Sequence, residues 1–504
     1  MGCVIAIDAG TTGVRALAVD EGGRVVDVSY REITQYFPRP GWVEHDAAEI
    51  WAAVAATVDE VARRRRGAGQ AVAGIGITNQ RETVVAWDRS TGRPLHRAIV
   101  WQDRRTAGRC DELHQAGHLA VVRERTGLVL DPYFSATKMS WLLTDGGVAD
   151  SPTLVLGTVD SWLIWNLTGG TDGGVVVTDP TNAGRTLLFD IRAREWSGEL
   201  AEIFGVPLGA LPAVGPSCGR FGIVAGDLAG GGSPLAGVPV SGVAGDQQAA
   251  LFGQACFSPG MAKVTYGTGS FVLANVGEAC PPPSEGLLTT VAWDLGGHGG
   301  SSPVAYALEG AVFVTGAAVQ WLRDGLGLIG EAAEIGPLAA QVASTDGVYL
   351  VPAFTGLGSP WWDPYARGTI TGLTRGVGRA HLARAVVEAM AFQVRDVVDA
   401  MTGAGGDVSA LRVDGGASVM DLLLQLQADQ VRVPVERPAT SETTALGAAW
   451  LAGLAEGVWG SLDELGAIWS LERSFAPAAS AVAADAAHAG WRRAVERSLG
   501  WAQA

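Results

Sequence analysis

Cysteine is scarce in this chain and shows no pattern. Five cysteines are scattered over 504 residues, with no C-x-x-C pair and an odd total. Such a set fits neither a disulfide framework nor a zinc site, and it favours a reducing compartment. Long apolar runs are also lacking, and the first predicted strand begins at once, without the basic and apolar regions of a signal peptide. The sequence therefore predicts a cytoplasmic protein that does not insert into a membrane.

Basic residues are in the minority. The chain carries 36 Lys and Arg against 52 Asp and Glu, a formal charge of −16, which repels phosphate backbones and argues against a nucleic-acid partner. The one basic run, Arg63 to Arg66, ends a predicted helix over residues 46–64, where positive charge complements the helix dipole. His114 and His118 in "HQAGH" lack the glutamate of a zinc-protease motif, so we predict no metal ligand among the seven histidines.

The chain is too long for one hydrophobic core, and its pattern predicts two domains. Apolar strands are expected at residues 4–8, 14–20 and 24–30, joined by short Gly-containing turns, and a buried strand at 71–80 follows the predicted helix. Turns this short favour a meander, so the sheet should be mixed.

A similar pattern starts again near residue 250. Residues 261–277 again give a strand, a Gly/Thr turn and a strand. They are followed by a long helix whose predicted apolar face carries Leu382, Val386, Met390, Val394 and Val397, and by a strand at 410–418 that runs into another helix. We therefore predict an internal duplication, with one domain at 1–250 and the other at 251–504.

Two glycine-rich turns have the composition of phosphate-binding loops. In "DAGTTG" and "YGTGS", glycine lets backbone N–H groups approach a phosphate, threonine adds hydroxyl donors, and the acid before the first turn can hold magnesium through water. Two such loops facing each other would grip one nucleotide, and Gly415-Gly416 could admit an adenine ring. Each turn alone is also typical of an ordinary hairpin, and the chain has no P-loop motif.

Polar residues cluster after two other predicted strands. Gln80, Arg81 and Glu82 end the strand at 71–80, and Asp246 and Gln247 precede a helix of small residues. From the residues alone, a structural ion pair and a helix cap explain these positions at least as well as a binding site does.

Taken together, the motifs resemble those of the FGGY carbohydrate-kinase family from about residue 4 to about residue 500, and the acceptor motifs resemble its glycerol-phosphorylating branch. In chain order they are "IDAGTTGVRA", "PGWVEHD", "GITNQRETVVAW", "AIVWQDRRT", "TGLVLDPYFSATK", "GTVDSWLIWNLT", "VAGDQQAALFGQ", "YGTGSF", "YALEGAVFVTGAAVQWLRD", "VPAFTGLGSPWWDPYARG" and "ALRVDGGAS".

The resemblance implies an α/β fold of two actin-like, ribonuclease-H-like domains with mixed β-sheets and an active-site cleft between them. It also implies Mg²⁺- and ATP-dependent phosphorylation of glycerol to sn-glycerol 3-phosphate in glycerol catabolism, by a homo-oligomer, either a dimer or a tetramer. Two alternatives stay open: another polyol or ketose kinase of the family, and a non-catalytic actin-like nucleotide switch.

The resemblance further implies a role for each matching residue. Asp246 would be the general base, and Asp8 with Asp246 would hold Mg²⁺. Glycerol would contact Arg81, Glu82, Trp101, Tyr133, Asp246, Gln247 and Phe271. The nucleotide would contact Thr11, Thr12, Gly13, Arg15, Thr268, Gly316, Gln320, Gly416 and Met420.

Two positions depart from the family's pattern. Met420 stands where an asparagine usually contacts the purine, and methionine can pack on a base but cannot read its edge, so we expect weakened nucleotide selectivity. Gly237 stands where an arginine of the fructose 1,6-bisphosphate loop would fall, so we expect no inhibition by that sugar.

Overall fold

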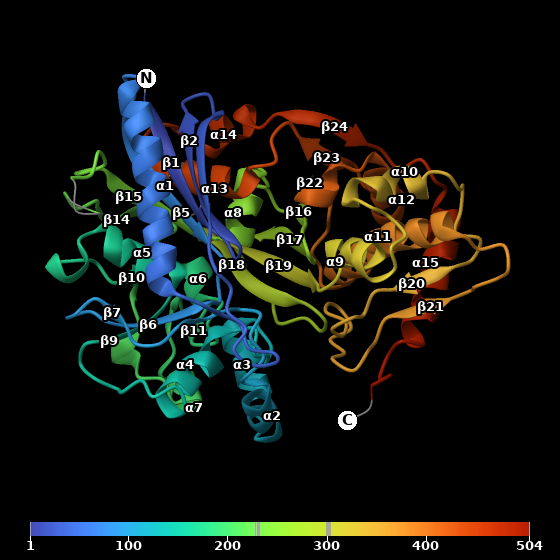
Figure 1. Ribbon diagram of the computed structural model, residues 1–504, viewed down its shortest axis with the longest axis horizontal. Helices are drawn as coiled ribbons and strands as arrows, with labels where there is room; N and C mark the ends of the chain where they lie inside the picture. The colour runs from blue at the N-terminus through green and yellow to red at the C-terminus, as the bar shows by residue number, and fades with distance from the viewer. Residues whose placement is uncertain (1, 227, 229–231, 299–303, 503–504) are drawn as a thin grey trace.

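A computed structural model describes residues 2–226, 228, 232–298 and 304–502, and two large β-sheets dominate it (Figure 1). The first sheet has the strand order β14-β15-β5-β1-β2-β3. β1, β2 and β3 form an antiparallel meander, β5 and β15 continue parallel to β1, and β14 is an antiparallel edge, so the predicted mixed sheet is confirmed. The bounds are β1 Gly2–Ala9, β2 Gly13–Asp20, β3 Val25–Glu32, β5 Ala71–Asn79, β14 Cys218–Ile223 and β15 Pro239–Gly245.

The second sheet repeats this topology. Its order is β18-β19-β17-β16-β22-β23-β24. Without β18, every strand direction matches the first sheet, and the order of the first five strands matches as well, as an internal duplication predicts. The antiparallel edge strands differ in chain order, because β14 precedes its neighbour β15 whereas β24 follows its neighbour β23. The bounds are β16 Met261–Tyr266, β17 Ser270–Gly277, β18 Leu288–Asp294, β19 Val304–Val312, β22 Ala410–Asp414, β23 Val435–Pro438 and β24 Leu471–Phe475.

Both faces of the central part of the first sheet are covered, which explains why β1 and β5 are largely apolar, whereas the edge strand β3 is mostly exposed. Along β1, Ile5 and Ile7 point into the core under α1 (Ala47–Gly67), whereas Val4 and Ala6 point to the opposite face. Asp46 caps α1 by accepting from the amides of residues 48 and 49.

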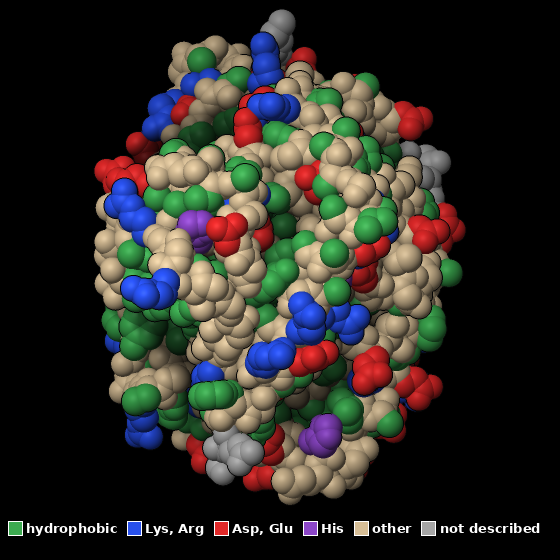
Figure 2. Space-filling view, turned by 90° about the vertical axis from the view of Figure 1, so that its right-hand side faces the viewer, with side chains coloured by type: hydrophobic (Ala, Val, Ile, Leu, Met, Phe, Trp, Pro, Cys, Tyr) green, Lys and Arg blue, Asp and Glu red, His purple; other side chains and the backbone are tan. Residues whose placement is uncertain are grey.

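The arginine run at the end of α1 is neutralised locally. Arg64 and Arg65 reach Asp27 of β3 at 2.9 and 2.8 Å, and Arg63 reaches Asp59 at 2.6 Å. The run is therefore the paired helix end that the sequence indicates. Figure 2 shows a similar balance on the face at the right of Figure 1, where basic side chains lie beside acidic ones.

In the second half, α11 (Arg379–Gly403) takes the place of α1. Four of its predicted core residues, Val386, Met390, Val394 and Val397, are fully buried, and Leu382 is partly buried. The strand after it, β22, ends at Asp414 rather than at residue 418. The chain turns there because Gly415, with a φ of +84°, packs against the backbone of Tyr266, where a Cβ atom would lie 2.4 Å from the carbonyl oxygen.

Two helices join the halves through direct backbone contact. α8 (Asp246–Gly253) follows β15, and α13 (Thr443–Ala455) follows β23 at the equivalent position. A Cβ atom on Gly253 would lie 1.9 Å from the Thr443 carbonyl oxygen, and one on Gly447 would lie 1.8 Å from that of Ala249. Only glycine allows this approach, so these two positions fix how the helices cross.

The remaining elements flank these sheets. Three smaller sheets and several helices surround the ends of the strands of the first half. The largest of these sheets contains β4 Glu44–His45, β6 Val84–Asp88, β7 Arg93–Pro94, β8 Ala98–Ile99 and β9 Leu154–Thr158, and the other two are the pairs β10 Val177–Thr178 with β13 Ala213–Val214 and β11 Phe189–Asp190 with β12 Glu195–Trp196. The helices are α2 Ala107–Gln115, α3 Leu119–Thr126, α4 Ser135–Thr144, α5 Val159–Leu167, α6 Pro180–Ala183 and α7 Gly198–Phe204. The second half adds α9 Gly316–Gln320, α10 Ile335–Ala339, β20 Tyr349–Val351, β21 Thr369–Thr371, α12 Asp421–Val431, α14 Leu462–Ile468 and α15 Ala481–Glu496. Among the described residues, no helix is long and apolar enough to cross a membrane.

Candidate active site

The candidate site lies where parallel strands end together. Ala9, Asn79 and Gly245, the last residues of β1, β5 and β15, are in register at one edge of the first sheet. Asp8, Gln80-Arg81-Glu82 and Asp246-Gln247 therefore meet there, as expected for ligand sites at the carboxyl ends of strands.

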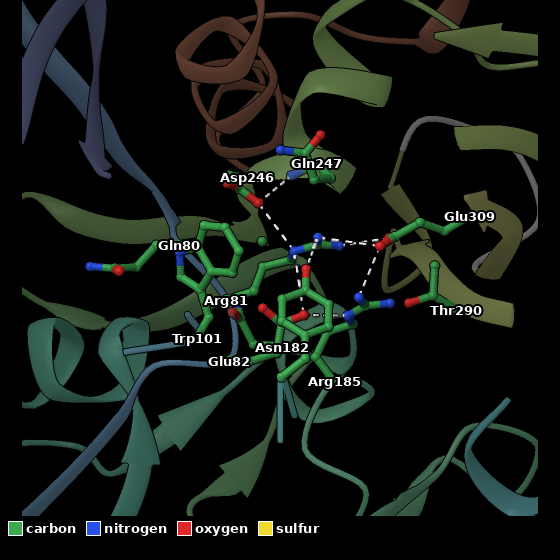
Figure 3. Close-up of polar contacts among 12 residues, drawn as sticks. Gln80, Arg81, Glu82, Trp101, Asn182, Arg185, Asp246, Gln247, Thr290 and Glu309 are labelled. Atoms are coloured by element: carbon green, nitrogen blue, oxygen red, sulfur yellow. Dashed lines mark hydrogen bonds and ion pairs between the residues drawn. The ribbon is translucent and has the colours of Figure 1, made fainter. Parts of the chain in front are cut away.

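Arg81 is the centre of the polar cluster in Figure 3. Its side chain is 2% exposed, and its φ of +59° is a strained backbone conformation for a non-glycine residue. The guanidinium pairs with Glu309 of β19 at 2.7 Å, with Asp246 at 3.2 Å, and donates to the Tyr133 hydroxyl at 2.8 Å. Arg81 thus connects residues from both halves of the chain.

A second buried arginine completes a balanced charge network. Arg185 contacts Glu82 through Nε at 2.6 Å and Glu309 through Nη2 at 2.9 Å, and all three side chains are almost completely buried. Burial by itself would raise the pKa of Glu309, but Arg185 and Arg81 hold that pKa below its usual value. The contacts of Glu82 with both arginines use Oε1, so Oε2 is the atom it can offer to a ligand.

Asp246 and Gln247 begin α8 and are held differently. The Gln247 amide N–H donates to Asp246 Oδ1 at 2.7 Å, and burial raises the pKa of the Asp246 carboxyl. The Gln247 side-chain oxygen accepts from the Nζ of Lys263 on β16, which also donates to Thr265 at 2.8 Å. Burial lowers the pKa of Lys263 to about 8.

Aromatic rings border this polar cluster. Trp101 and Tyr133 meet edge to face with centroids 5.6 Å apart, and the Arg81 guanidinium lies 5.6 Å from the centroid of Phe271. The structure thus brings all seven predicted acceptor residues into one contiguous set.

Lys138 stabilises the turn that carries Tyr133. Lys138 is fully buried, and its Nζ donates to the carbonyls of Pro132, Tyr133 and Phe134 at 2.9, 2.6 and 2.9 Å. Burial lowers its pKa to about 8. Three consecutive acceptors on one ammonium group fix the backbone from which the Tyr133 hydroxyl reaches Arg81.

The first predicted phosphate loop, residues 10–13, is a tight turn closed by the Gly10 amide on the Gly13 carbonyl at 3.0 Å. Thr12 is exposed at its tip, and Thr11 is partly buried. Asp8 stands before it, and burial raises the pKa of that carboxyl to about 7.

The charge of Arg15, another predicted nucleotide residue, already has a protein partner. It lies on β2 directly opposite Asp8 and makes a partly exposed ion pair with Glu442 at 3.1 Å. Arg15 would have to leave or share this pair to contact a phosphate.

The second loop carries the other predicted nucleotide contacts. Thr268 is exposed in the turn between β16 and β17, and its carbonyl accepts from the amide of Thr315 at 3.0 Å, which brings the start of α9 with Gly316 against the loop. Gln320 is exposed at the other end of α9.

The predicted base contacts follow β22. Gly416 is exposed, and a Cβ atom there would meet nothing within 4 Å. Met420 is partly buried and packs against α10, where a Cβ atom on Gly336 would lie 3.2 Å from its Cγ atom.

Three residues of the cluster, Arg185, Lys263 and Glu309, are absent from the sequence-based prediction. Each left a signal in the sequence, because Glu309 and Lys263 interrupt apolar strands and Arg185 stands in a buried, largely uncharged segment. A lone charge in an apolar run must be paired if it is buried, which makes such positions candidates for a charge network.

The comparisons with known proteins define the class first. Residues 3–253 match the N-terminal domain and residues 262–456 the C-terminal domain of the FGGY family of carbohydrate kinases. The chain belongs to this family, as the resemblance predicts, and membership of a kinase family implies ATP as a substrate.

The relatives narrow the class further. The glycerol kinase of Bordetella parapertussis is 53% identical over 505 residues, which cover 99% of this chain and 98% of that one. Glycerol kinase 2 of Thermotoga maritima is 51% identical over 503 residues, covering 99% of both chains. The crystal structure of Plasmodium falciparum glycerol kinase with ADP superposes with a TM-score of 0.91 at 35% identity, over 99% of this chain and 98% of that one. The predicted two-domain, actin-like fold is confirmed.

Proposed function

We propose that this protein transfers the γ-phosphoryl group of ATP to a primary hydroxyl of glycerol, giving sn-glycerol 3-phosphate in glycerol catabolism. The observation that carries the proposal is the buried pair Arg81 and Glu82 at the end of β5, with Asp246 3.2 Å from Arg81. Full-length identity above 50% to glycerol kinases supports it.

A triol offers hydroxyl groups alone, so its recognition needs matched donors and acceptors. Arg81 can donate, Glu82 can accept through Oε2, and Gln247 can donate through its amide nitrogen because its oxygen is taken by Lys263. A ligand that lacks one hydroxyl would leave a buried polar group unpaired, which is a strong basis for selectivity. Trp101 and Phe271 would pack against the carbon atoms.

Asp246 is the group we assign to the reacting hydroxyl. Phosphoryl transfer passes through a loose transition state, so the hydroxyl needs orientation more than early deprotonation. Asp246 is fixed from two sides, by the Arg81 guanidinium and by the amide of Gln247, and would accept the hydroxyl proton as the bond to phosphorus forms.

The chemistry of the donor set fits magnesium. Asp8 and Asp246 provide hard carboxylate oxygens. Among the described residues, no three or more His, Cys, Asp or Glu side chains lie together so that they could hold a metal ion. Mg²⁺ would therefore complete its coordination shell with water and phosphate oxygens. When bound, Mg²⁺ neutralises charge on the transferring phosphoryl group. Thr11, Thr12, Gly13, Arg15 and Thr268 would hold the phosphates, with Gly316, Gln320, Gly416 and Met420 along the nucleoside.

The test is ADP release from ATP and Mg²⁺, comparing glycerol with dihydroxyacetone, erythritol, ribulose, xylulose and no acceptor. We expect glycerol to be used far better than the others, and Asp246→Asn to lower kcat by about a hundredfold or more because the shape is kept and the proton acceptor is lost. A preference for a ketose would assign a different acceptor within the family, and background release with every acceptor would favour the nucleotide switch.

We also propose a cytoplasmic homo-oligomer, a dimer or a tetramer. Analytical ultracentrifugation of the purified protein tests the assembly, and a monomer at micromolar concentration would refute it.

A further inference from the structure

Two hydrogen-bonded routes connect Trp101, which is predicted to pack against glycerol, to the first phosphate loop. The Trp101 indole Nε1 donates directly to Thr11 Oγ1 at 2.9 Å. The Trp101 backbone N–H donates to Thr83 Oγ1 at 3.2 Å, Thr83 Oγ1 donates to Gln80 Oε1 at 3.0 Å, and Gln80 Nε2 donates to the Gly10 carbonyl at 3.3 Å. Because residues 10 and 11 are neighbours, these contacts form a closed ring, which we call the Thr83 ring. Gln80 and Trp101 lie together on the side of Arg81 away from Glu309 (Figure 3).

The direction of every bond in the ring is fixed by chemistry. An indole N–H and a backbone N–H can only donate. Thr83 therefore accepts from Trp101 and gives its own proton to Gln80 Oε1, which leaves the amide nitrogen of Gln80 to donate to Gly10. In the direct route, the Thr11 hydroxyl oxygen accepts from the Trp101 indole N–H, so the Thr11 hydroxyl proton can point out of the ring.

The centre of the ring, Thr83 and Gln80, is buried, whereas Gly10, Thr11 and Trp101 are partly buried, so the bond between Thr83 and Gln80 is the costliest to break. Thr83 is 0% exposed and Gln80 is 3% exposed. In such surroundings an unpaired donor or acceptor carries its full desolvation penalty, and chained hydrogen bonds reinforce one another. A further hydrogen bond, from the backbone N–H of Gln80 to the Ala9 carbonyl at 3.1 Å, also holds the end of β5 against the end of β1.

We propose that the Thr83 ring couples acceptor binding to nucleotide binding, so that an acceptor packed against Trp101 fixes the Thr11 hydroxyl as a donor to a phosphate. This inference rests on the proposed function. Gln80 and Thr83 are positioning residues in it, since Thr83 is fully buried and acts only through Trp101 and Gln80. The coupling is reciprocal, because each ligand must change the affinity for the other by the same factor.

The experiment measures that factor directly by titration calorimetry. The Kd of Mg²⁺ and the non-hydrolysable ATP analogue AMPPNP is determined without glycerol and with saturating glycerol, and the Kd of glycerol is determined without and with AMPPNP. We expect a coupling factor of about fivefold or more in the unaltered protein.

Thr83→Val keeps the shape of the side chain and removes the hydroxyl, and Thr83→Ser is the matched control that keeps it. We expect Thr83→Val to lower the coupling factor by about threefold or more, toward one, which is within the effect of one buried hydrogen bond, and Thr83→Ser to preserve it. Trp101→Phe, which keeps a ring but loses the indole N–H, should reduce coupling as well, and it carries the test if Thr83→Val does not fold.

An unaltered protein that binds both ligands with a coupling factor of one would overturn the proposal, as would folded Thr83→Val and Trp101→Phe variants with unchanged coupling. Failure of the proposed function is seen separately, because the unaltered protein would then not turn over glycerol in the acceptor panel.

Discussion

Glu309 provides the sharpest test of the charge network, because it touches both buried arginines from the other half of the chain. Its side chain is 0% exposed and reaches Arg81 at 2.7 Å and Arg185 at 2.9 Å. Glu309→Gln keeps the shape but removes the charge, so two guanidinium groups would share the negative charge of Glu82 and the more distant Asp246. Breaking a buried ion pair costs about 3–5 kcal/mol, and we expect destabilisation at the lower end of that range because one amide oxygen still accepts.

The effect on turnover follows from the orientation of Arg81. A hydrogen bond to a charged group contributes about 1.5–3 kcal/mol, which corresponds to about 10- to 150-fold in kcat/KM for glycerol if Arg81 loses its fixed position. The assays are urea unfolding followed by fluorescence and steady-state kinetics with varied glycerol. Glu199→Gln is the control, because its pair with Arg125 at 3.5 Å is about half exposed and should contribute little.

A folded Glu309→Gln variant with kcat/KM within about threefold of the unaltered protein would refute this reasoning, since that is less than one charged hydrogen bond provides. Equal losses of stability and of kcat/KM in Glu309→Gln and Glu199→Gln would also refute the reasoning, because a buried and an exposed ion pair would then contribute alike.

Three other predictions address single side chains. Lys263→Met should raise the KM for glycerol by about tenfold with a smaller change in kcat, because the Gln247 amide loses the donor that orients it, and an unchanged KM in steady-state assays would count against the assignment. Met420→Asn should lower the KM for ATP and increase the preference for ATP over GTP, since an amide can read a purine edge, and a competition assay with both nucleotides decides it. Burial raises the pKa of Asp160 from 3.8 in the unfolded chain to about 7 in the fold, so the folded state holds the extra proton between these values and the protein should lose stability as pH rises from about 4 to 7. Asp160→Asn should flatten that pH dependence in thermal melts, and an identical slope in both proteins would contradict it.

Much of the first sheet is predictable because local signals and tertiary structure agree. In β1, neighbouring residues point to opposite covered faces, which makes the strand apolar throughout and easy to detect. In the turn after it, a Cβ atom on Gly13 would lie 2.4 Å from the exposed ring of Tyr30, so a larger residue there would displace that ring. The sequence predicts a strand at 410–418, which is too long, because the contact of Gly415 with Tyr266, almost 150 residues earlier in the chain, ends β22 at Asp414.

In the candidate site too, the residues that follow a local sequence pattern are predictable and those brought in by distant strands are not. Arg81 and Asp246 follow strands that end at one sheet edge, and a sequence pattern can indicate such an edge. Glu309 lies 228 residues from Arg81, and nothing local predicts that the strand carrying it will cover that edge. The roles assigned to the acceptor and nucleotide residues stay predictions until the variants above are measured.

Lys138 and Lys263 are the two lysines of the chain, and both are fully buried beside the candidate site. An acylating reagent added to the folded protein therefore meets no exposed lysine amine. Modification of either residue requires the core around Tyr133 or Gln247 to open first. Mass spectrometry of the acylated protein over time would thus measure how often the site opens, and how far bound ligands suppress it, with no reporter group introduced.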